Sequence, residues 1–309
     1  MFVRDQVEAL RRLGGVDVQV RHFPPGKRSY ITAAIQLRRS RKERFEVVHA
    51  HYGLSGWSAL AAARRRLIVT FHGTDLRHPI VGPLSRILVR LIGLPAAVSG
   101  SLARSGVPGA GSRRAVAVLP CGVDVERFRP LDRSAARARL GLDPKRPLLL
   151  FPSDPARKVK RHDRALELER HFADVELLTL RGVPPDEVPL WVNASNAVLV
   201  TSDREGFGLA TLEALACDVP VLATPVGIAP LVLTEVEGAL CAPYDERVWV
   251  PQLQRHVEAS DPRVDGRRHA ELFSSERMAE RVLAVYRELA AGRSDRGAAQ
   301  SASAGHQRE

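Results

Sequence analysis

Residues 201–230, TSDREGFGLATLEALACDVPVLATPVGIAP, contain the pattern that decides the fold of this chain. An apolar run at 197–201 predicts a buried strand, and the leucines from Leu209 onward recur on one face of a helix. Gly206 and Gly208 lie between the two, where the missing side chain allows a ligand to approach the backbone closely. Because the free amides and the dipole at a helix start favour negative charge, this strand, loop and helix predict a phosphate site.

Strand and helix patterns alternate on both sides of this segment, which is typical of parallel sheets covered by helices. Amphipathic patterns at 2–13 and from Ser274 predict the outermost helices, the second with Ser274 or Ser275 as a candidate cap. Turn residues and dense charge at 120–146 separate the two series of strands. The predicted strands cover residues 16–21, 46–50, 67–71, 96–99 and 115–119 in the first series and 147–152, 175–180, 197–201, 219–224 and 238–241 in the second.

The length of 309 residues and the hydrophobic content of 45% predict a globular protein with two domains. We expect a Rossmann-like first domain over residues 1–143 and a Rossmann-like second domain over 144–273. Residues 274–290 are predicted to form a terminal helix that packs back toward the first domain. Residues 291–309 have almost no large apolar side chains and are predicted to be a disordered tail.

Positive charge is concentrated in the first half of the chain. Residues 1–150 contain 27 Lys and Arg against ten Asp and Glu, whereas residues 151–309 contain 19 against 25. Such a field attracts phosphorylated substrates, anionic lipid headgroups or nucleic acid. The lack of zinc-finger spacing and an aromatic content of 5% argue against nucleic acid. Residues 84–94, LSRILVRLIGL, fit either an interfacial helix or a core helix with two exposed arginines.

The sequence contains no apolar run long enough for a membrane span and no secretion-signal pattern at its start. Its three cysteines, Cys121, Cys217 and Cys241, have the spacing of neither a disulfide framework nor a zinc site. These observations predict a cytoplasmic protein. Peripheral contact of the basic half with the inner face of the membrane is a further expectation.

Two carboxylates, Glu205 and Glu213, flank the glycine loop with seven residues between them. Together with the following ALACDVPVLATPVG, they resemble the donor-site motif of the retaining glycosyltransferases of family 4, also called glycosyl transferases group 1. The resemblance implies the GT-B fold, an α/β architecture of two Rossmann-like domains whose parallel sheets face each other across a cleft. It also implies that Glu213 holds the ribose of a nucleoside-diphosphate sugar. The donor sugar would be positioned by Glu205 and by the backbone of Gly206, Phe207, Gly208 and Leu209.

The first half resembles the same family at 47–56, VVHAHYGLSG, and at 69–79, VTFHGTDLRHP. In the family a histidine after a strand faces the donor sugar from the N-terminal domain, which implies this role for His72. Asp75 and Arg77 would then face the acceptor or the cleft.

Two further segments extend the resemblance. FPSDPARKVKRHD at 151–163 resembles the loop that contacts the donor pyrophosphate, and Lys160 matches its lysine. The arginine usual in this loop is absent, and Arg157 is the expected substitute. Fixed cations there would stabilise the charge that develops on the leaving nucleoside diphosphate. LPCGVDVERFRP at 119–130 resembles the interdomain element, with Cys121 in place of an asparagine and a packing role rather than a nucleophilic one.

One departure concerns the start of the chain. Family members begin with a strand and a glycine-bearing loop before the helix that FVRDQVEALRR matches, and this sequence contains neither. A first sheet without that strand would leave backbone groups unpaired. We therefore favour a misassigned start over a truncated chain or a changed domain.

The resemblance implies transfer of a sugar, with retention of configuration, to a glycan, lipid-linked or small-molecule acceptor in cell-envelope or polysaccharide synthesis. No metal and no cofactor are expected, because Lys160, Arg157 and the helix start near Gly208 would carry the diphosphate. Family members generally have no well-placed protein nucleophile, which implies a front-face reaction with a donor phosphate oxygen as the base. A nucleotide-sugar epimerase or phosphorylase of the same fold and a non-catalytic nucleotide-sugar-binding relative remain open alternatives.

Overall fold

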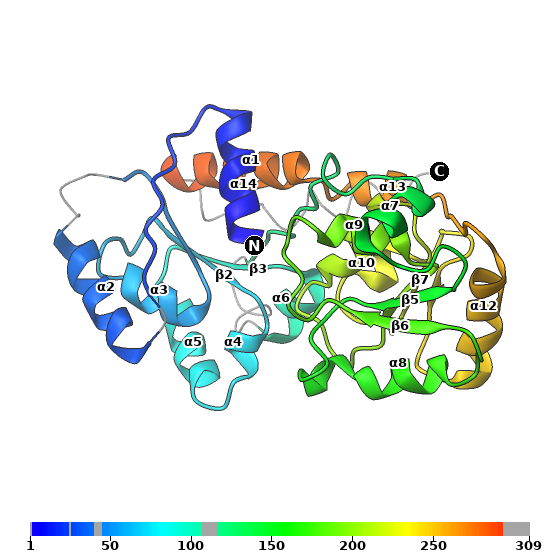
Figure 1. Ribbon diagram of the computed structural model, residues 1–309. Coiled ribbons are helices and arrows are strands. Elements are labelled where there is room, and N and C mark those ends of the chain that lie inside the picture. Colours follow the sequence, from blue (N-terminus) through cyan, green and yellow to red (C-terminus); the bar gives the residue numbers. More distant parts are fainter. Residues whose placement is uncertain (1, 25, 40–44, 107–115, 293–309) are drawn as a thin grey trace, which may run out of the picture. The chain divides into compact units, whose positions relative to one another are not determined.

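The computed structural model describes residues 2–24, 26–39, 45–106 and 116–292 (Figure 1). It contains two compact units, each built around one parallel sheet. The first-sheet unit comprises Gln6–Pro120 and Met278–Glu309, and the second-sheet unit comprises Met1–Asp5 and Cys121–Arg277. The predicted α/β class is therefore confirmed. The predicted tail at 291–309 lies almost entirely outside the described residues.

The first sheet has the strand order β1-β2-β3-β4, and all its strands are parallel. Its strands are β1 (Val48–His51), β2 (Leu67–Phe71), β3 (Leu94–Ala97) and β4 (Ala117–Val118). Helices connect successive strands, as parallel pairing requires. The helices of this unit are α2 (Lys27–Arg39), α3 (Gly53–Ala59), α4 (Thr74–Arg77), α5 (Val81–Val89), α6 (Gly100–Gly106) and most of α1 (Phe2–Leu13) and α14 (Ser275–Ala290).

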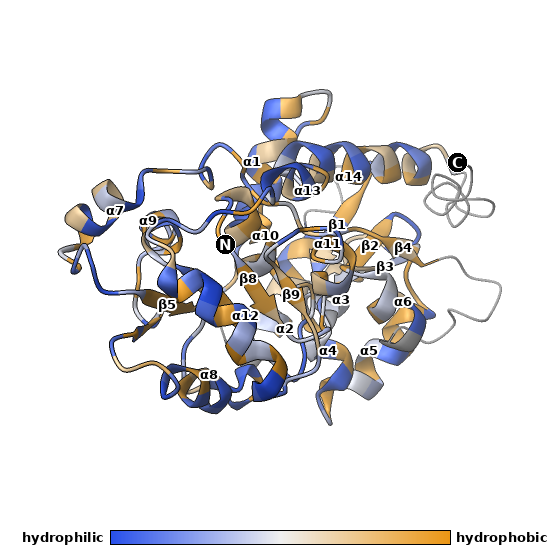
Figure 2. Cartoon of the chain, turned by 90° about the vertical axis from the view of Figure 1, so that its right-hand side faces the viewer, coloured by the Kyte–Doolittle hydropathy of each residue, from blue (hydrophilic) through white to orange (hydrophobic). Residues whose placement is uncertain are grey.

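The central strand β2 is buried on both faces, as its run of apolar residues predicts. Ile68 packs in a core with Leu10 of α1 and Val282 of α14. Val69 points to the opposite face, where α3 approaches so closely that a Cβ at Gly56 would lie 2.8 Å from a Val69 methyl group. Figure 2 shows the alternation of hydrophilic and hydrophobic residues along α14 that provides its buried stripe.

Of the two candidate caps, Ser274 is the one that caps α14. Its hydroxyl accepts a hydrogen bond of 3.2 Å from the backbone N–H of Arg277. This contact satisfies one of the amides that a helix start leaves free.

The predicted strand at 16–21 is wrong. Val16 and Val18 are partly buried against the core of the first-sheet unit, so the alternation of apolar residues does reflect burial. The backbone nevertheless forms no ladder in the described residues, and the carbonyl of Val18 accepts a hydrogen bond of 3.1 Å from the Arg11 side chain instead. An extended segment that packs by alternate side chains has the same sequence pattern as a strand.

The second sheet is parallel and has the strand order β6-β5-β7-β8-β9. Its strands are β5 (Leu148–Phe151), β6 (Glu176–Thr179), β7 (Ala197–Val200), β8 (Val221–Ala223) and β9 (Leu240–Cys241). The chain runs from β5 to β6 on one side and then returns to β7 on the other, so the strand order reverses between β5 and β7. In open parallel sheets this switch point is where ligands bind, outside the carboxyl ends of the strands.

Helices surround the second sheet, and its core includes Phe151 of β5, Leu199 of β7 and Trp249 of α12. The helices of this unit are α7 (Arg133–Leu140), α8 (His162–Glu169), α9 (Val188–Ala194), α10 (Leu209–Ala216), α11 (Ala229–Val232), α12 (Glu246–Glu258) and α13 (Arg267–Glu271). A short 3-10 turn, Lys158–Lys160, follows β5.

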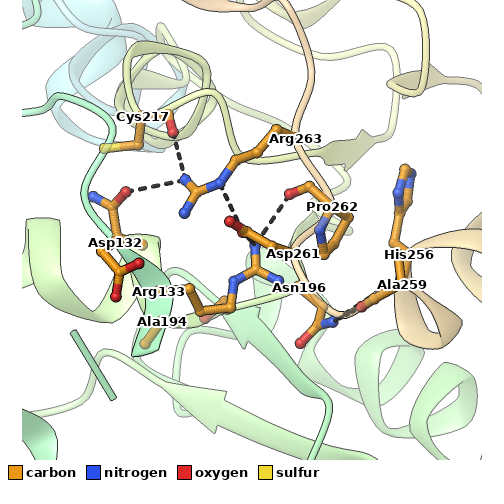
Figure 3. A network of polar contacts seen from close by, with 12 residues as sticks. Asp132, Arg133, Ala194, Asn196, Cys217, His256, Ala259, Asp261, Pro262 and Arg263 are labelled. Atoms are coloured by element: carbon orange, nitrogen blue, oxygen red, sulfur yellow. Dashed lines mark hydrogen bonds and ion pairs between the residues drawn. The ribbon is translucent and has the colours of Figure 1, made fainter. Parts of the chain in front are cut away.

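The sequence predicts the division near residue 143, whereas contacts group the chain from Cys121 onward with the second sheet. Buried arginines of α7 provide the reason. Arg137 donates to the carbonyl of Ala194 at 2.9 Å and to the Asn196 side chain at 2.8 Å. Figure 3 shows Arg133 and Arg263 converging on Asp261, with Arg133 3.1 Å from that carboxylate. These guanidinium groups attach α7 to the second sheet.

Across the described residues, no helix combines the length and the apolar content that crossing a bilayer requires.

Candidate active site

A pocket lies where the second sheet has its switch point. It is formed by the carboxyl ends of β5 and β7, the 3-10 turn after β5 and the loop that precedes α10. Its lining residues are Phe151, Pro152, Ser153, Lys160, Leu199, Val200, Ser202, Glu205, Gly208, Leu209 and Ala210. A larger and more open hollow lies near His171 and Glu246, at the start of α12, away from the ends of these strands. The topology of the sheet favours the first pocket as the ligand site.

The loop before α10 is fixed by contacts that require glycine. Gly208 has a φ of 93° and directly precedes the first residue of α10. The carbonyl of Phe207 accepts a hydrogen bond of 2.7 Å from the Ile228 N–H, and the Phe207 ring packs against Phe273. A Cβ at Gly227 would lie only 2.3 Å from the Phe207 oxygen. The free amides at the start of α10 therefore hold a defined position in the pocket.

Lys160 and Glu205, which are 45 residues apart in the sequence, meet in this pocket. The Nζ atom of Lys160 lies 2.6 and 2.8 Å from the two carboxylate oxygens of Glu205. The Ser202 hydroxyl donates to the same carboxylate at 2.7 Å. The side chains of Lys160 and Glu205 are 16% and 11% exposed, so solvent screens this ion pair only partly.

Lys160 is positioned through its backbone by the end of β7. The Thr201 hydroxyl donates to the Lys160 carbonyl at 3.0 Å, and the Asp203 N–H donates to the Val159 carbonyl at 3.0 Å. The 3-10 turn is therefore attached to the same loop that carries Glu205. This attachment fixes the distance between the cation and the start of α10.

Glu213 lies on α10 and is 7% exposed. Burial raises the pKa of its carboxyl group to about 7, and the nearby guanidinium of Arg127 lowers that pKa in part. Among the residues that the structure describes, none forms a hydrogen bond with this carboxylate. A pair of ligand hydroxyl groups would supply the hydrogen bonds that a buried carboxylate needs.

Arg157 is exposed at the beginning of the 3-10 turn and does not line the pocket. Its carbonyl accepts a hydrogen bond of 2.8 Å from the Lys160 N–H, which places the two residues at opposite ends of one turn. Of the two predicted cations, the structure therefore brings only Lys160 into the pocket.

His72 belongs to the first-sheet unit and follows β2. Its Nε2 atom lies 3.3 Å from Nδ1 of His51, whose ring stacks on that of His49. Burial lowers the pKa of His72 to about 3 and that of His51 to about 4, and the pKa of His49 is also well below its usual value because of burial. All three rings are therefore neutral near pH 7. In the described part of the chain, no group of three or more His, Cys, Asp or Glu side chains has a geometry that could hold a metal ion.

Asp75 is 6% exposed, and its carboxylate holds the loop after β2. It accepts backbone hydrogen bonds from His72, Gly73 and Gly53 at 3.1, 3.0 and 3.2 Å. Burial raises the pKa of this carboxyl group, and these hydrogen bonds oppose the increase. The carboxylate therefore serves the loop that presents His72.

Comparisons with known proteins identify the family of the chain. Residues 3–127 match the family model described as Glycosyltransferase Family 4, and residues 156–271 match the one described as Glycosyl transferases group 1. A D-inositol 3-phosphate glycosyltransferase from Geodermatophilus obscurus is 30% identical, with coverage of 85% of this chain and 71% of that protein. The chain belongs to glycosyltransferase family 4. The relative of the same name from Frankia alni is 33% identical, with coverage of 68% of this chain and 65% of that protein, so the chain spans about two thirds of the length of these relatives.

Solved structures support the GT-B fold of this family 4 chain. Sucrose-phosphate synthase from Thermosynechococcus elongatus superposes with a TM-score of 0.69 at 20% identity, over 94% of this chain and 93% of that chain. Anabaena HepE in complex with UDP and glucose superposes with a TM-score of 0.67 at 15% identity, over 91% and 89%.

Within the family 4 motif, sequence reasoning missed residues that hold the named ones in place. Ser202 supports Glu205, Thr201 fixes Lys160, and Gly227 allows close approach of the donor loop. The sequence does show hydroxyl residues, Thr201 and Ser202, at the end of one predicted strand and Gly227 after the next. Their partners were not, because each lies on a different segment of the chain.

The expected packing role of the element at 119–130 is confirmed for its buried residues. Phe128 is completely buried, and the Asp124 carboxylate accepts backbone hydrogen bonds from Glu126 and Arg127 at 3.1 and 3.0 Å. Burial raises the pKa of the Cys121 thiol to about 12, so this family 4 chain has no reactive thiolate there.

Proposed function

We propose that this chain is a retaining glycosyltransferase that moves a sugar from a nucleoside-diphosphate sugar to an acceptor hydroxyl group. The observation that carries the proposal is the Lys160–Glu205 pair beside the start of α10, at the switch point of the second sheet. A cation and free amides at one end of the pocket suit a diphosphate. Membership of family 4 supports the same reaction class.

The donor is assigned by the chemistry of each group in the second-sheet unit. Lys160 would contact the diphosphate, and the Glu213 carboxylate would accept hydrogen bonds from the two ribose hydroxyl groups. Glu205 and the backbone from Gly206 to Leu209 would position the sugar. Because Anabaena HepE is described in complex with UDP and glucose, UDP is the first nucleotide to test.

In the proposed reaction the acceptor oxygen bonds to the anomeric carbon on the face from which the diphosphate departs. The bond between that carbon and the phosphate oxygen breaks, and the acceptor proton passes to the departing phosphate. Lys160 and the start of α10 would stabilise the negative charge on the leaving group. The predicted contact of His72 with the donor sugar and the predicted role of Arg157 at the diphosphate remain proposals.

The acceptor side is proposed to be the basic first-sheet unit. Residues 6–120 contain 19 Lys and Arg against five Asp and Glu, a balance that favours an acceptor with negative charge. A phosphorylated small molecule or a lipid-linked glycan has that property. A role in cell-envelope or polysaccharide synthesis, in the cytoplasm and without a metal ion, is part of the same proposal.

Thermal denaturation in the presence of UDP, GDP, ADP or dTDP tests the donor site. Selective binding raises the melting temperature by mass action, and we expect this for one nucleotide. The matching nucleotide sugar and an acceptor panel should then give a product whose anomeric configuration, read by NMR, equals that of the donor. Release of an epimerised nucleotide sugar would favour an epimerase. A folded chain stabilised by none of the nucleotides would overturn the proposal.

A further inference from the structure

The first-sheet unit exposes an unusual number of large apolar side chains on two of its helices. Three of them lie on α2, two lie on α5, and one directly precedes α5. They are Tyr30, Ile31, Ile35, Ile80, Leu84 and Ile87, with exposed fractions of 38, 65, 48, 70, 39 and 49%. We call these six residues and the arginines between them the α2–α5 surface. Clusters of this kind mark interaction sites, whereas scattered exposed apolar residues do not.

Both helices of the α2–α5 surface pack on α3 (Figure 1). The Ser58 hydroxyl donates to the Tyr30 carbonyl at 2.9 Å, and the Trp57 ring nitrogen donates to the Leu84 carbonyl at 3.2 Å. These two hydrogen bonds attach the exposed helices to neighbouring residues of α3. The apolar residues are therefore held in place by side chains of a third helix.

The charge on this surface is of one sign. Arg28, Arg38 and Arg39 are exposed on α2, and Arg86 and Arg90 are exposed at α5. Figure 2 shows hydrophilic and hydrophobic residues together on α5. The sequence contains no Asp or Glu at 18–42, 47–74 or 76–123. Asp75, which lies between 47–74 and 76–123, is buried, and its carboxylate accepts hydrogen bonds from backbone N–H groups.

Three kinds of partner can be compared with this surface. A second copy of the chain would bring like charges together, which disfavours association. Nucleic acid would engage the arginines through its phosphates but would leave exposed isoleucines without a role. An anionic bilayer offers phosphate groups for the arginines and, beneath them, an acyl boundary for isoleucine, leucine and tyrosine.

We propose that the α2–α5 surface docks on an anionic phospholipid bilayer. The proposal adds a location to the transferase proposed above and predicts an acceptor that is presented at a membrane. Binding to vesicles needs neither donor nor acceptor, so this proposal and the proposed reaction are tested separately.

The experiment measures sedimentation of the full chain with vesicles of phosphatidylcholine alone and of equal parts phosphatidylcholine and phosphatidylglycerol. We expect binding to the anionic vesicles only, weakened by high salt because the arginines act at the surface. Ile31→Ser/Ile87→Ser should reduce binding about tenfold or more, since both side chains lose their insertion into the acyl boundary. Arg86→Gln should reduce it about fivefold, the effect of one cation near an anionic surface.

Matched controls lie in the second-sheet unit. Val248→Ser removes a side chain that is 46% exposed on α12, and Arg255→Gln removes an exposed cation from the same helix. Neither should change vesicle binding. Melting temperatures and the nucleotide-induced stabilisation should be equal in all variants, which separates loss of docking from loss of folding or of the donor site.

Two outcomes would overturn the proposal. Equal vesicle binding by the wild type and Ile31→Ser/Ile87→Ser would show that the apolar residues do not insert. Binding to single- or double-stranded nucleic acid that exceeds vesicle binding and survives the isoleucine substitutions would assign the arginines to nucleic acid instead.

Discussion

The substitution Glu213→Gln should stabilise the folded protein at high pH while it weakens nucleotide binding. In the folded state the pKa of Glu213 is about 7, against 4.5 for an ordinary glutamate, because the carboxyl group is buried. That difference corresponds to about 3 kcal/mol of extra cost for ionising this side chain in the folded protein. Glutamine has nearly the same shape and carries no charge, so it removes this cost.

The sign of the pH dependence follows from the raised pKa of this acid. Below about pH 4.5 the carboxyl group is protonated in the folded and the unfolded chain, and it does not affect stability. As the pH rises, the unfolded chain releases its proton first, and the folded state loses stability until the pH exceeds about 7. The advantage of Glu213→Gln over the wild type should therefore grow by about 2–3 kcal/mol between pH 5 and pH 8.

Guanidinium denaturation followed by tryptophan fluorescence measures this advantage. In a Trp57→Phe background the signal comes from Trp191 and from the fully buried Trp249, both in the second-sheet unit. Glu235→Gln removes an exposed carboxylate and controls for the general loss of one negative charge. If Glu213→Gln has the same advantage at pH 5 and at pH 8, the reasoning about its burial is refuted. If it is stabilised but binds the nucleotide as the wild type does, the ribose role is refuted.

Lys160→Ala should lower turnover about 10²-fold or more, because it removes the fixed positive charge beside the leaving diphosphate. Lys158→Ala, at the exposed end of the same turn, should leave turnover unchanged. Similar steady-state rates for the two variants would contradict the assignment. Gly227→Ala should weaken nucleotide affinity about tenfold or more, because its Cβ would lie 2.3 Å from the Phe207 oxygen of the donor loop. Gly182→Ala is the control, since Gly182 also has a positive φ but nothing lies within 4 Å of its added Cβ. Equal losses of affinity in calorimetric titration would point to backbone strain alone. Because the pKa of His51 is about 4 in the folded state, the wild type loses stability as the pH falls below 6.5. The destabilisation caused by His51→Asn should therefore shrink by about 3 kcal/mol between pH 7 and pH 4. A difference in the free energy of unfolding that does not depend on pH would contradict this.

The sequence predicts the strands well where burial alone determines them. β2 coincides with the predicted run at 67–71, and β5 and β7 lie within the runs predicted for them. The strand predicted at 16–21 is wrong because an extended segment that is buried on one side has the same alternation of apolar residues as a strand, with no ladder of hydrogen bonds. Pairing in a sheet depends on a neighbouring segment, which no local pattern contains.

Residues 120–146, between the two series of strands, show a second reason why the sequence alone misplaces a feature. Their density of charge suggests a solvated connection, yet Arg133 and Arg137 are 4% and 3% exposed. An arginine can be buried when carbonyl and carboxylate oxygens match its planar group. The Pro144 carbonyl that Arg137 contacts is local, but the carbonyls of Ala194 and Pro262 lie 57 and 129 positions from the arginines that they bind. The domain boundary therefore moves with contacts that lie outside the segment.

The structure places some of the predicted site residues in one pocket and others outside its lining. Lys160, Glu205 and Gly208 line that pocket, whereas Glu213 and Arg157 are not among its lining residues. The orientation of Arg157 depends on how tightly the 3-10 turn closes onto Lys160. A spacing of three residues in the sequence does not determine that closure.

The contact between Lys160 and Glu205 affects which anions can enter the pocket. Two opposite charges at 2.6 Å cancel at a distance, so beyond the screening length of about 8 Å the pocket attracts anions only weakly. Inorganic phosphate or sulfate would have to replace a carboxylate that Ser202 also holds, and it brings neither a ribose nor a sugar to add further contacts. A ligand that carries ribose, diphosphate and sugar together can compensate for breaking the pair. The pocket should therefore discriminate against the abundant small anions of a cell before any sugar is recognised.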